Sequence, residues 1–290
     1  MDKLEQEQLG VPDDNPPQET GSQLSLWPPE SAPPQPISPI PSQPAPDLDP
    51  PWSLADVGAF VLFAVVSFFL ANVVAVAVFL ALRQQFSWGI TLAEAFTRTP
   101  FVVLMQTGWE MLWLFFIYYV VTVKYRRSFW EAIKWLRGPH PATAYLIAGV
   151  ALALVANFLF SVFPSEKQLP IERLFSSPES AYLLAIFGVC VAPFVEELVF
   201  RGFFYPVFEK LWGMLPAVVL TALLFASIHI PQLRGGWQEI MAIFFVGAAF
   251  SFCRGITGSL LPPFLMHFAY NASLFVSLYF STDHFRTLKG

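Results

Sequence analysis

Three short stretches of the sequence place charged, imidazole and amide side chains inside long apolar runs. They are Glu196-Glu197-Leu-Val-Phe-Arg201, Phe225-Ala-Ser-Ile-His229 and His267-Phe-Ala-Tyr-Asn271. A charged group at the centre of a bilayer costs about 2.5–3.5 kcal/mol on insertion scales, so such groups persist mainly where they pair or do chemistry. One carboxylate, two imidazoles and one amide in a dry cavity suit the hydrolysis of an amide bond.

Spacing separates the two adjacent glutamates into different roles. They point about 100° apart on a helix, so we expect that they do not address one target. Glu197 stands four residues before Arg201, the favourable order for an acid-base pair, and is expected to neutralise it. Glu196 is then free to act as a general base that takes a proton from water.

The other polar residues complete this predicted site. His229 is expected to help hold the water, and His267 with Asn271 to stabilise the oxyanion of the tetrahedral intermediate. A second version places Zn²⁺ on His229, His267 and Glu196, where the metal would activate the water. The residue types do not decide between the two versions, so zinc stays open as a cofactor.

Composition indicates that these residues lie in a lipid bilayer. Hydrophobic residues make up 55% of the 290-residue chain and charged residues only 13%. Apolar segments of roughly 17–25 residues, the length that crosses a bilayer as a helix, recur from Trp52 onward. The sequence therefore predicts an all-α, polytopic transmembrane helix bundle. Seven helices are expected, with six or eight as alternatives, at 53–82, 101–123, 143–163, 181–211, 214–230, 237–253 and 261–281.

The helices expected on either side of Gly213 bring two motif residues together. Glu196 and His229 are each about 16 positions from the turn, which corresponds to about 24 Å of helix. A hairpin at Gly213 then places them face to face at one depth. Phe225, one turn before His229, is expected to wall the cavity beside the imidazole.

The last helix is expected to begin at Pro262-Pro263, because proline fits the first helical turn. His267 and Asn271 are four residues apart and then project from the same face. Glu110, in the second span, has two open interpretations, as a partner in helix packing or as a residue that lines the cavity.

Charge and proline content define a separate N-terminal tail. The first 50 residues hold 13 prolines and nine acidic residues against the single Lys3. Such a segment does not bury enough apolar surface to fold, so 1–51 is expected to be disordered, with a possible partner site in its proline-rich part. The remaining chain is divided into N-terminal membrane helices, 52–175, and a catalytic bundle, 176–282. No basic patch indicates nucleic acid.

Orientation follows from the basic residues of the short loops. The loop after the second span carries five of them and should be cytoplasmic, together with the acidic tail and the turn at Glu209-Lys210. The five are Lys124, Arg126, Arg127, Lys134 and Arg137. We expect a multi-pass protein of the cell membrane, with the endoplasmic reticulum as the eukaryotic alternative.

The ordered motifs EExxxR, FxxxH and HxxxN, spread over about 80 residues, resemble the signature of the CPBP family of CAAX-protease and bacteriocin-processing intramembrane proteases. The resemblance covers roughly 180–280. It implies that Glu196 is the catalytic glutamate, that Glu197 and Arg201 complete the first motif, that His229 belongs to the second, and that His267 and Asn271 form the third. It also implies a membrane-bound peptide or protein substrate, which in some members is prenylated.

Three function classes stay open at this point. The first is an intramembrane endopeptidase, glutamate-dependent or metal-dependent. The second is a non-catalytic membrane scaffold or bacteriocin-immunity protein that retains the fold. The third is a transporter with a buried acid as its proton site, although such proteins typically contain internal repeats and this sequence has none that we detect.

Overall fold

The computed structural model describes residues 50–87, 89–162, 169–234 and 236–287. The chain divides into the units Met1–Pro46 and Asp47–Gly290, and every described element lies in the second. The predicted disordered tail, 1–51, falls almost entirely outside the described residues. Within the described ranges all regular elements are helical, which confirms the all-α prediction.

The seven predicted segments are all helical, with shifted boundaries and short additional elements between them. In the N-terminal part the order is α1 (Leu54–Phe86), α2 (Leu92–Thr97), α3 (Thr99–Tyr118), the π-helical η1 (Tyr119–Lys124), α4 (Phe129–Ala132) and α5 (Ala142–Val162). A 3₁₀ turn, η2 (Pro170–Leu174), precedes the rest. These are α6 (Pro178–Ile186), η3 (Phe187–Val191), α7 (Ala192–Glu197), η4 (Leu198–Phe204), α8 (Tyr205–Trp212), α9 (Met214–His229), α10 (Trp237–Thr257) and α11 (Leu261–Ser281).

Five of the described helices are long and apolar enough to cross a membrane. They are Leu54–Phe86, Thr99–Lys124, Ala142–Val162, Pro178–Trp212 and Trp237–Thr257. Of the other two predicted spans, α9 has only 16 residues and α11 has the length but a more polar composition. The polytopic bundle is thus observed, and His229 and His267 lie on the two predicted spans that do not meet the criteria of length and composition.

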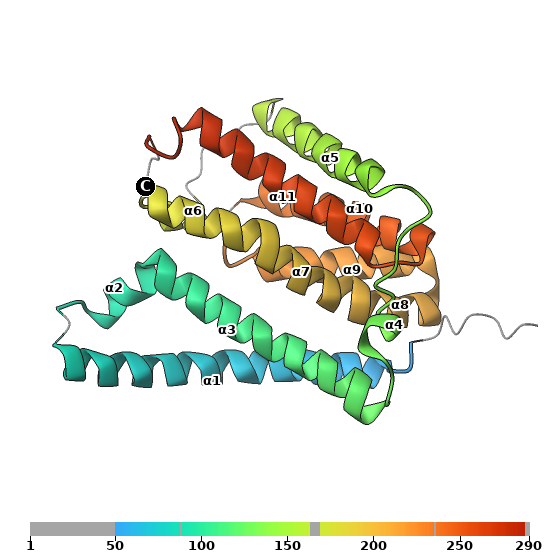
Figure 1. The fold of residues 1–290 in the computed structure, drawn as a ribbon, viewed down its shortest axis with the longest axis horizontal. Helices are drawn as coiled ribbons and strands as arrows, with labels where there is room; N and C mark the ends of the chain where they lie inside the picture. Colours follow the sequence, from blue (N-terminus) through green and yellow to red (C-terminus); the bar gives the residue numbers. More distant parts are fainter. Residues whose placement is uncertain (1–49, 88, 163–168, 235, 288–290) are drawn as a thin grey trace, which may run out of the picture. The chain divides into compact units, whose positions relative to one another are not determined.

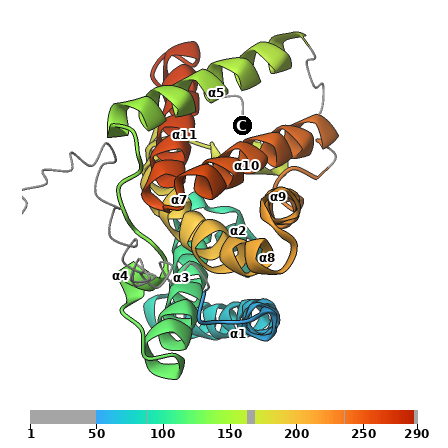
Figure 2. The same ribbon diagram turned by 90° about the vertical axis from the view of Figure 1, so that its right-hand side faces the viewer.

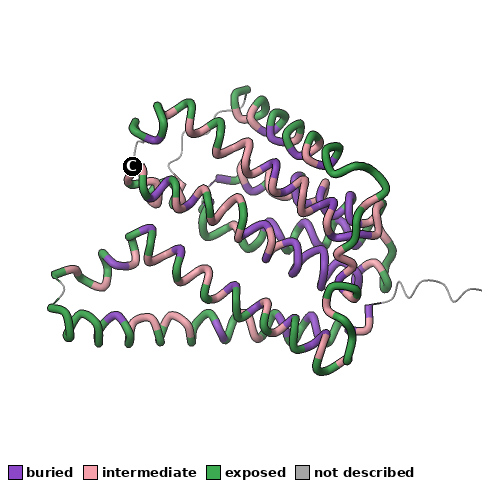
Figure 3. The backbone as a smooth tube through the Cα atoms, viewed as in Figure 1, coloured by how far each residue is buried: buried purple, intermediate pink, exposed green. Residues whose placement is uncertain are grey.

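The helices form a bundle whose interior contains the segment 178–212, which carries the first motif (Figures 1 and 2). α1 packs against α3 on one side, α5 packs against α11 on the other, and 178–212, α9 and α10 lie between these pairs. Buried residues concentrate in the α7–α8 segment and its neighbours, whereas α1 is largely exposed along its length (Figure 3). The exposed side chains of α1 are mostly Val, Leu and Phe, as expected for a helix that faces lipid.

One end of the bundle is held by contacts between distant loops. The Lys124 ammonium group and the Tyr125 hydroxyl both donate to the carboxylate of Asp56, which also forms the capping box of α1 with Ser53. The backbone N–H of Leu260 donates to the carbonyl of Lys134 at 2.9 Å. The chain's first described residues, the basic loop and the α10–α11 turn therefore lie at the same end.

The motif helix 178–212 is continuous but contains two π-helical turns, which the sequence had not indicated. In η3 the N–H of Ala192 bonds to the carbonyl of Phe187, and in η4 the N–H of Tyr205 bonds to the carbonyl of Phe200. The next residue in each case is a proline, Pro193 or Pro206, which has no N–H to continue this i to i−5 pattern. Each π turn therefore leaves one carbonyl that needs a donor from elsewhere.

Candidate active site

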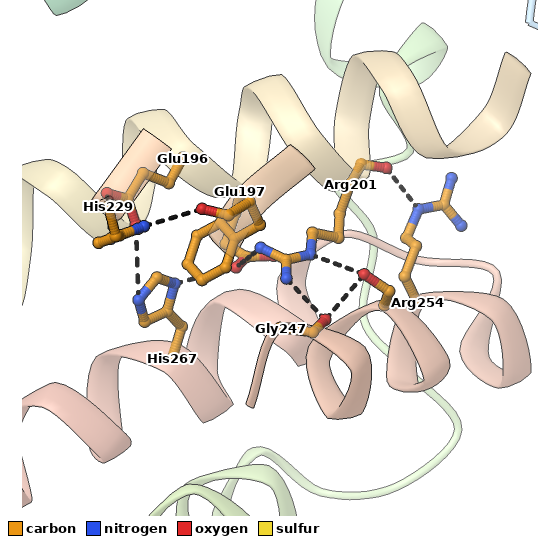
Figure 4. A network of polar contacts seen from close by, with 9 residues as sticks. Glu196, Glu197, Arg201, His229, Gly247, Arg254 and His267 are labelled. Carbon is orange, nitrogen blue, oxygen red and sulfur yellow. Dashed lines mark hydrogen bonds and ion pairs between the residues drawn. The ribbon is translucent and has the colours of Figure 1, made fainter. Parts of the chain in front are cut away.

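The first motif is centred on a fully buried ion pair. Nη1 of Arg201 donates to Oε1 of Glu197 at 2.9 Å, and neither side chain is exposed. α10 satisfies the remaining guanidinium groups, because Nη2 donates to the carbonyl of Gly247 at 2.7 Å and Nε donates to the hydroxyl of Ser251 at 3.1 Å. The expected Glu197–Arg201 pair is thus present, and its hydrogen bonds join the motif helix to α10 (Figure 4).

Glu197 also orients the histidine of the third motif. Its Oε1 lies 2.9 Å from Nδ1 of His267. A carboxylate paired with Arg201 only accepts hydrogen bonds, so Nδ1 of His267 carries a proton. In the neutral imidazole the lone pair is then on Nε2, which lies 3.7 Å from Oε2 of Glu196. The expectation that the two glutamates address different targets is wrong in this respect, since they contact opposite nitrogens of one ring.

His229 is oriented in the same sense by its own helix. Its Nδ1 lies 2.8 Å from the carbonyl oxygen of Phe225. A carbonyl oxygen only accepts, so Nδ1 is the donor and Nε2 carries the lone pair. That Nε2 lies 3.9 Å from Oε1 of Glu196. The hairpin at Gly213, whose φ of 81° favours glycine, therefore brings Glu196 and His229 face to face as the residue count predicted.

Three acceptors thus converge on one small space. Glu196 contributes a carboxylate with a side chain 13% exposed, and His229 and His267 each contribute an Nε2 lone pair. The separations of 3.7 and 3.9 Å are too long for direct hydrogen bonds. The three groups lack a partner that donates a hydrogen bond or carries positive charge. A proton, a water molecule or a cation between them would be such a partner.

Asn271 supplies the donor that the first π turn lacks. Its Nδ2 donates to the carbonyl of Gly188 at 2.7 Å, the group that Pro193 leaves without an N–H partner. One N–H of the amide is used in this contact, and the second remains. Asn271 lies on the cavity wall with His267, so the expected shared face of α11 is observed.

A cavity of about 990 Å³ opens beside these groups. Its lining comes from α1, α2, α3, α6, α7, α9, α10 and α11 and from the segments η2, η3 and η4, and is mainly Phe, Val, Leu and Ile. Glu196, His229, His267 and Asn271 reach it, whereas Glu197 and Arg201 do not. The cavity therefore combines a long apolar wall with one polar region.

Phe225 separates the polar network into layers. Its ring lies 4.9 Å from that of His229 and 5.8 Å from that of His267, between centroids, and the Arg201 guanidinium lies 4.5 Å from its centroid. On the other side of His267 the ring of Phe250 stacks at 4.7 Å. Phe225 thus lines the cavity as expected and also covers the buried cation.

The contribution of α10 to the site was not predicted from the sequence. Gly247, Ser251 and Arg254 follow one another at four and three residues on one face, and all three are buried. Arg254 donates from Nε to the carbonyl of Arg201 at 3.1 Å, the group that Pro206 leaves without an N–H partner. A small-residue stripe ending in an arginine inside an apolar run was the signal that could have revealed this face.

The residues proposed for zinc have suitable donor atoms. Among the described residues no group of three His, Cys, Asp or Glu side chains lies close enough together to hold a metal ion. The donors of His229, His267 and Glu196 are of the kind found in zinc sites, with both Nδ1–H groups held as in metal-ligating histidines. The chemistry of these donors therefore suits zinc as well as water.

Residues 178–273 match the family model of Rce1-like type II CAAX prenyl endopeptidases. This segment resembles the CPBP family. The match contains all three motifs and ends two residues after Asn271, while α1 to α5 lie outside it. Searches among curated proteins and among solved structures gave no significant match. This match, together with the apolar helices, indicates a multi-pass membrane protein and supports an intramembrane endopeptidase activity on a membrane protein substrate.

Proposed function

We propose that this protein is a glutamate-dependent intramembrane endopeptidase whose substrate is a membrane-bound, prenylated peptide or protein. The observation that carries the proposal is the convergence of the Glu196 carboxylate with the Nε2 lone pairs of His229 and His267. Water has two hydrogens to donate and one oxygen for nucleophilic attack, so it complements three acceptors beside an open cavity.

Glu196 is the general base in this proposal. It accepts a proton from the water as the water oxygen bonds to the scissile carbonyl carbon, and His229 accepts the other hydrogen bond of the water. His267 in its neutral form has no N–H on Nε2, so its earlier role as an oxyanion donor passes to the second N–H of Asn271. His267 instead helps to hold the water and can receive a proton.

Glu197 and Arg201 act as positioning residues. They do not line the cavity, yet one oxygen of Glu197 orders both Arg201 and His267. The apolar remainder of the cavity, about 990 Å³ in total, fits an aliphatic chain attached to the peptide. This fit and the family's prenylated substrates support the choice of a lipidated peptide as the probe.

The decisive experiment compares Glu196→Gln with wild type in proteoliposomes offered a farnesylated CAAX peptide. We expect the substitution to abolish cleavage, because the amide does not accept the proton of water. Glu179→Gln, the same change at the start of the same long helix and away from the cavity, is the matched control and should retain activity. If wild type shows no cleavage beyond that of Glu196→Gln, the protease proposal is wrong and the non-catalytic scaffold is favoured.

A metal-dependent version is the second candidate, because both imidazoles present Nε2 toward Glu196. In that version Glu196, His229 and His267 would hold the ion, which would supply Lewis acidity when bound. Cleavage that persists after stringent chelation, with no stoichiometric metal in the purified protein, would exclude it. Loss of cleavage on chelation and recovery with Zn²⁺ would favour it over the proposal above.

The membrane and topology assignments are parts of the same proposal. We infer a cell-membrane location with the tail, the basic loop at 124–137 and the turn at Gly213 on the cytoplasmic side. The tail remains a candidate partner-binding segment. Cysteine labelling from each side, at a site introduced in the basic loop, tests the orientation.

A further inference from the structure

A second carboxylate lines the cavity that contains Glu196. Glu110 belongs to α3, outside the segment that matches the family, and it is only 2% exposed. Oε1 accepts a hydrogen bond from Gln106 at 2.9 Å, one turn earlier on the same helix. Oε2 is buried with no hydrogen-bond partner among the described residues. Both Gln106 and Glu110 line the cavity that also contains Glu196.

A further polar atom on the same face of α3 is also unpartnered. Nε1 of Trp113, three residues after Glu110, is buried and has no hydrogen-bond partner among the described residues. Trp113 lines the same cavity. Buried polar groups without partners are rare in folded proteins, and two on one cavity wall indicate that a polar group of a ligand binds there.

Glu110 and Glu196 line the same cavity. Two carboxylates in one apolar cavity do not ionise together readily, because their charges repel and neither is solvated, so one of them keeps a proton. Gln106 donates a hydrogen bond to Glu110, and no Lys or Arg is among the described residues that line the cavity. Since the Gln106 N–H occupies Oε1, a proton on Glu110 lies on Oε2.

The position of Glu110 in the fold suits the nitrogen side of the scissile peptide bond. α7, which carries Glu196, contacts α11, and the adjoining η4 contacts α3. The helix of Glu196 therefore contacts both the α11 wall, which carries Asn271, and the α3 wall, which carries Glu110. A peptide bond attacked by the water at Glu196, with its carbonyl oxygen toward Asn271, directs its nitrogen to the α3 wall.

We propose that Glu110 is the general acid that protonates the leaving amine. This inference rests on the proposed endopeptidase function. The water loses one proton to Glu196 and its oxygen bonds to the carbonyl carbon. The C–N bond breaks with its electron pair passing to nitrogen, which takes the proton from Oε2 of Glu110. Glu196 returns its proton to Glu110 through water in the cavity, so one water and one amide give one acid and one amine.

The test uses two substrates that differ in the leaving group. One is a farnesylated CAAX peptide with its amide bond, and the other is the farnesylcysteine p-nitrophenyl ester, whose phenolate leaves without a proton. Both are offered to the full-length protein in proteoliposomes. For Glu110→Gln we expect kcat on the amide to fall about 100-fold or more, in the range of general acid catalysis, and kcat on the ester to stay within about threefold.

Two further variants make the result interpretable. Asp56→Asn removes a buried acid of α1 that does not line the cavity, and it should leave the amide-to-ester ratio unchanged. Glu196→Gln should lose both activities, because each substrate needs the activated water. Equal losses of Glu110→Gln on both substrates, or no loss on the amide, would overturn the role of Glu110 alone. If wild type cleaves neither the amide nor the ester faster than Glu196→Gln does, the proposed function is overturned as well.

Discussion

Nδ1 of His267 lies 2.9 Å from Oε1 of Glu197, and the same oxygen lies 2.9 Å from Nη1 of Arg201. A buried ion pair behind the cavity wall therefore decides which nitrogen of an imidazole faces Glu196. The partner of Glu197 on α11 is 70 residues away in the chain. Orientation of the site is thus a property of the packed bundle, and it can be perturbed without touching a cavity-lining residue.

Removal of Arg201 alone should lower the stability of the fold far more than removal of both members of the ion pair. Arg201→Met leaves Glu197 charged and buried, and breaking a buried pair in this way costs about 3–5 kcal/mol. The double variant Arg201→Met/Glu197→Gln has no uncompensated charge and should recover much of that loss. Thermal unfolding in detergent measures both. Double-variant stability no better than that of Arg201→Met would contradict this account.

Gly247 should not tolerate a methyl group. A Cβ at this position would lie 2.8 Å from Cδ1 of Phe225 and 3.4 Å from Nη2 of Arg201. Gly247→Ala is expected to lower stability by about 1–3 kcal/mol, as overpacking does, and to reduce cleavage because Phe225 covers the site. Gly58→Ala, where nothing lies within 4 Å of the new Cβ, is the control and should be neutral or slightly stabilising. Equal effects at the two glycines would refute the packing argument.

Asn271 should have separable structural and chemical roles. Asn271→Leu removes the donor to the Gly188 carbonyl and should destabilise by about 1–3 kcal/mol. Adding Pro193→Ala supplies a backbone N–H to that carbonyl, so stability should return in part. Cleavage should not return, because the second N–H of the amide is still missing. Recovery of activity in parallel with stability would assign Asn271 a purely structural role.

Arg254 and Pro206 should be energetically coupled although they are 48 positions apart. Arg254 donates to the carbonyl of Arg201 because Pro206 has no N–H to offer it. Arg254→Met should therefore destabilise less in a Pro206→Ala background than in wild type, with a coupling of about 0.5–3 kcal/mol. Unfolding of the two single variants and the double variant gives this energy. Strict additivity would show that the two residues serve the carbonyl independently.

Much of the site followed from counting residues along helices. The turn at Gly213 placed Glu196 opposite His229, and the four-residue spacings placed Glu197 with Arg201 and Asn271 with His267. These predictions succeeded because a helix has a constant rise and repeat, so positions in sequence become depth and face directly. The same regularity failed at Pro193 and Pro206, where π turns changed the register and created carbonyls that need outside donors.

Sequence alone determined the membrane environment, the all-helical class and the identity of the polar residues. These depend on local composition and on the repeat of residues along a helix. Only the tertiary structure decided which nitrogen of His229 and of His267 faces Glu196. It also brought Glu110 to the same cavity and Arg254 to the Arg201 carbonyl. Those relationships join helices separated by dozens of residues, and packing between helices has no period that can be read along one chain.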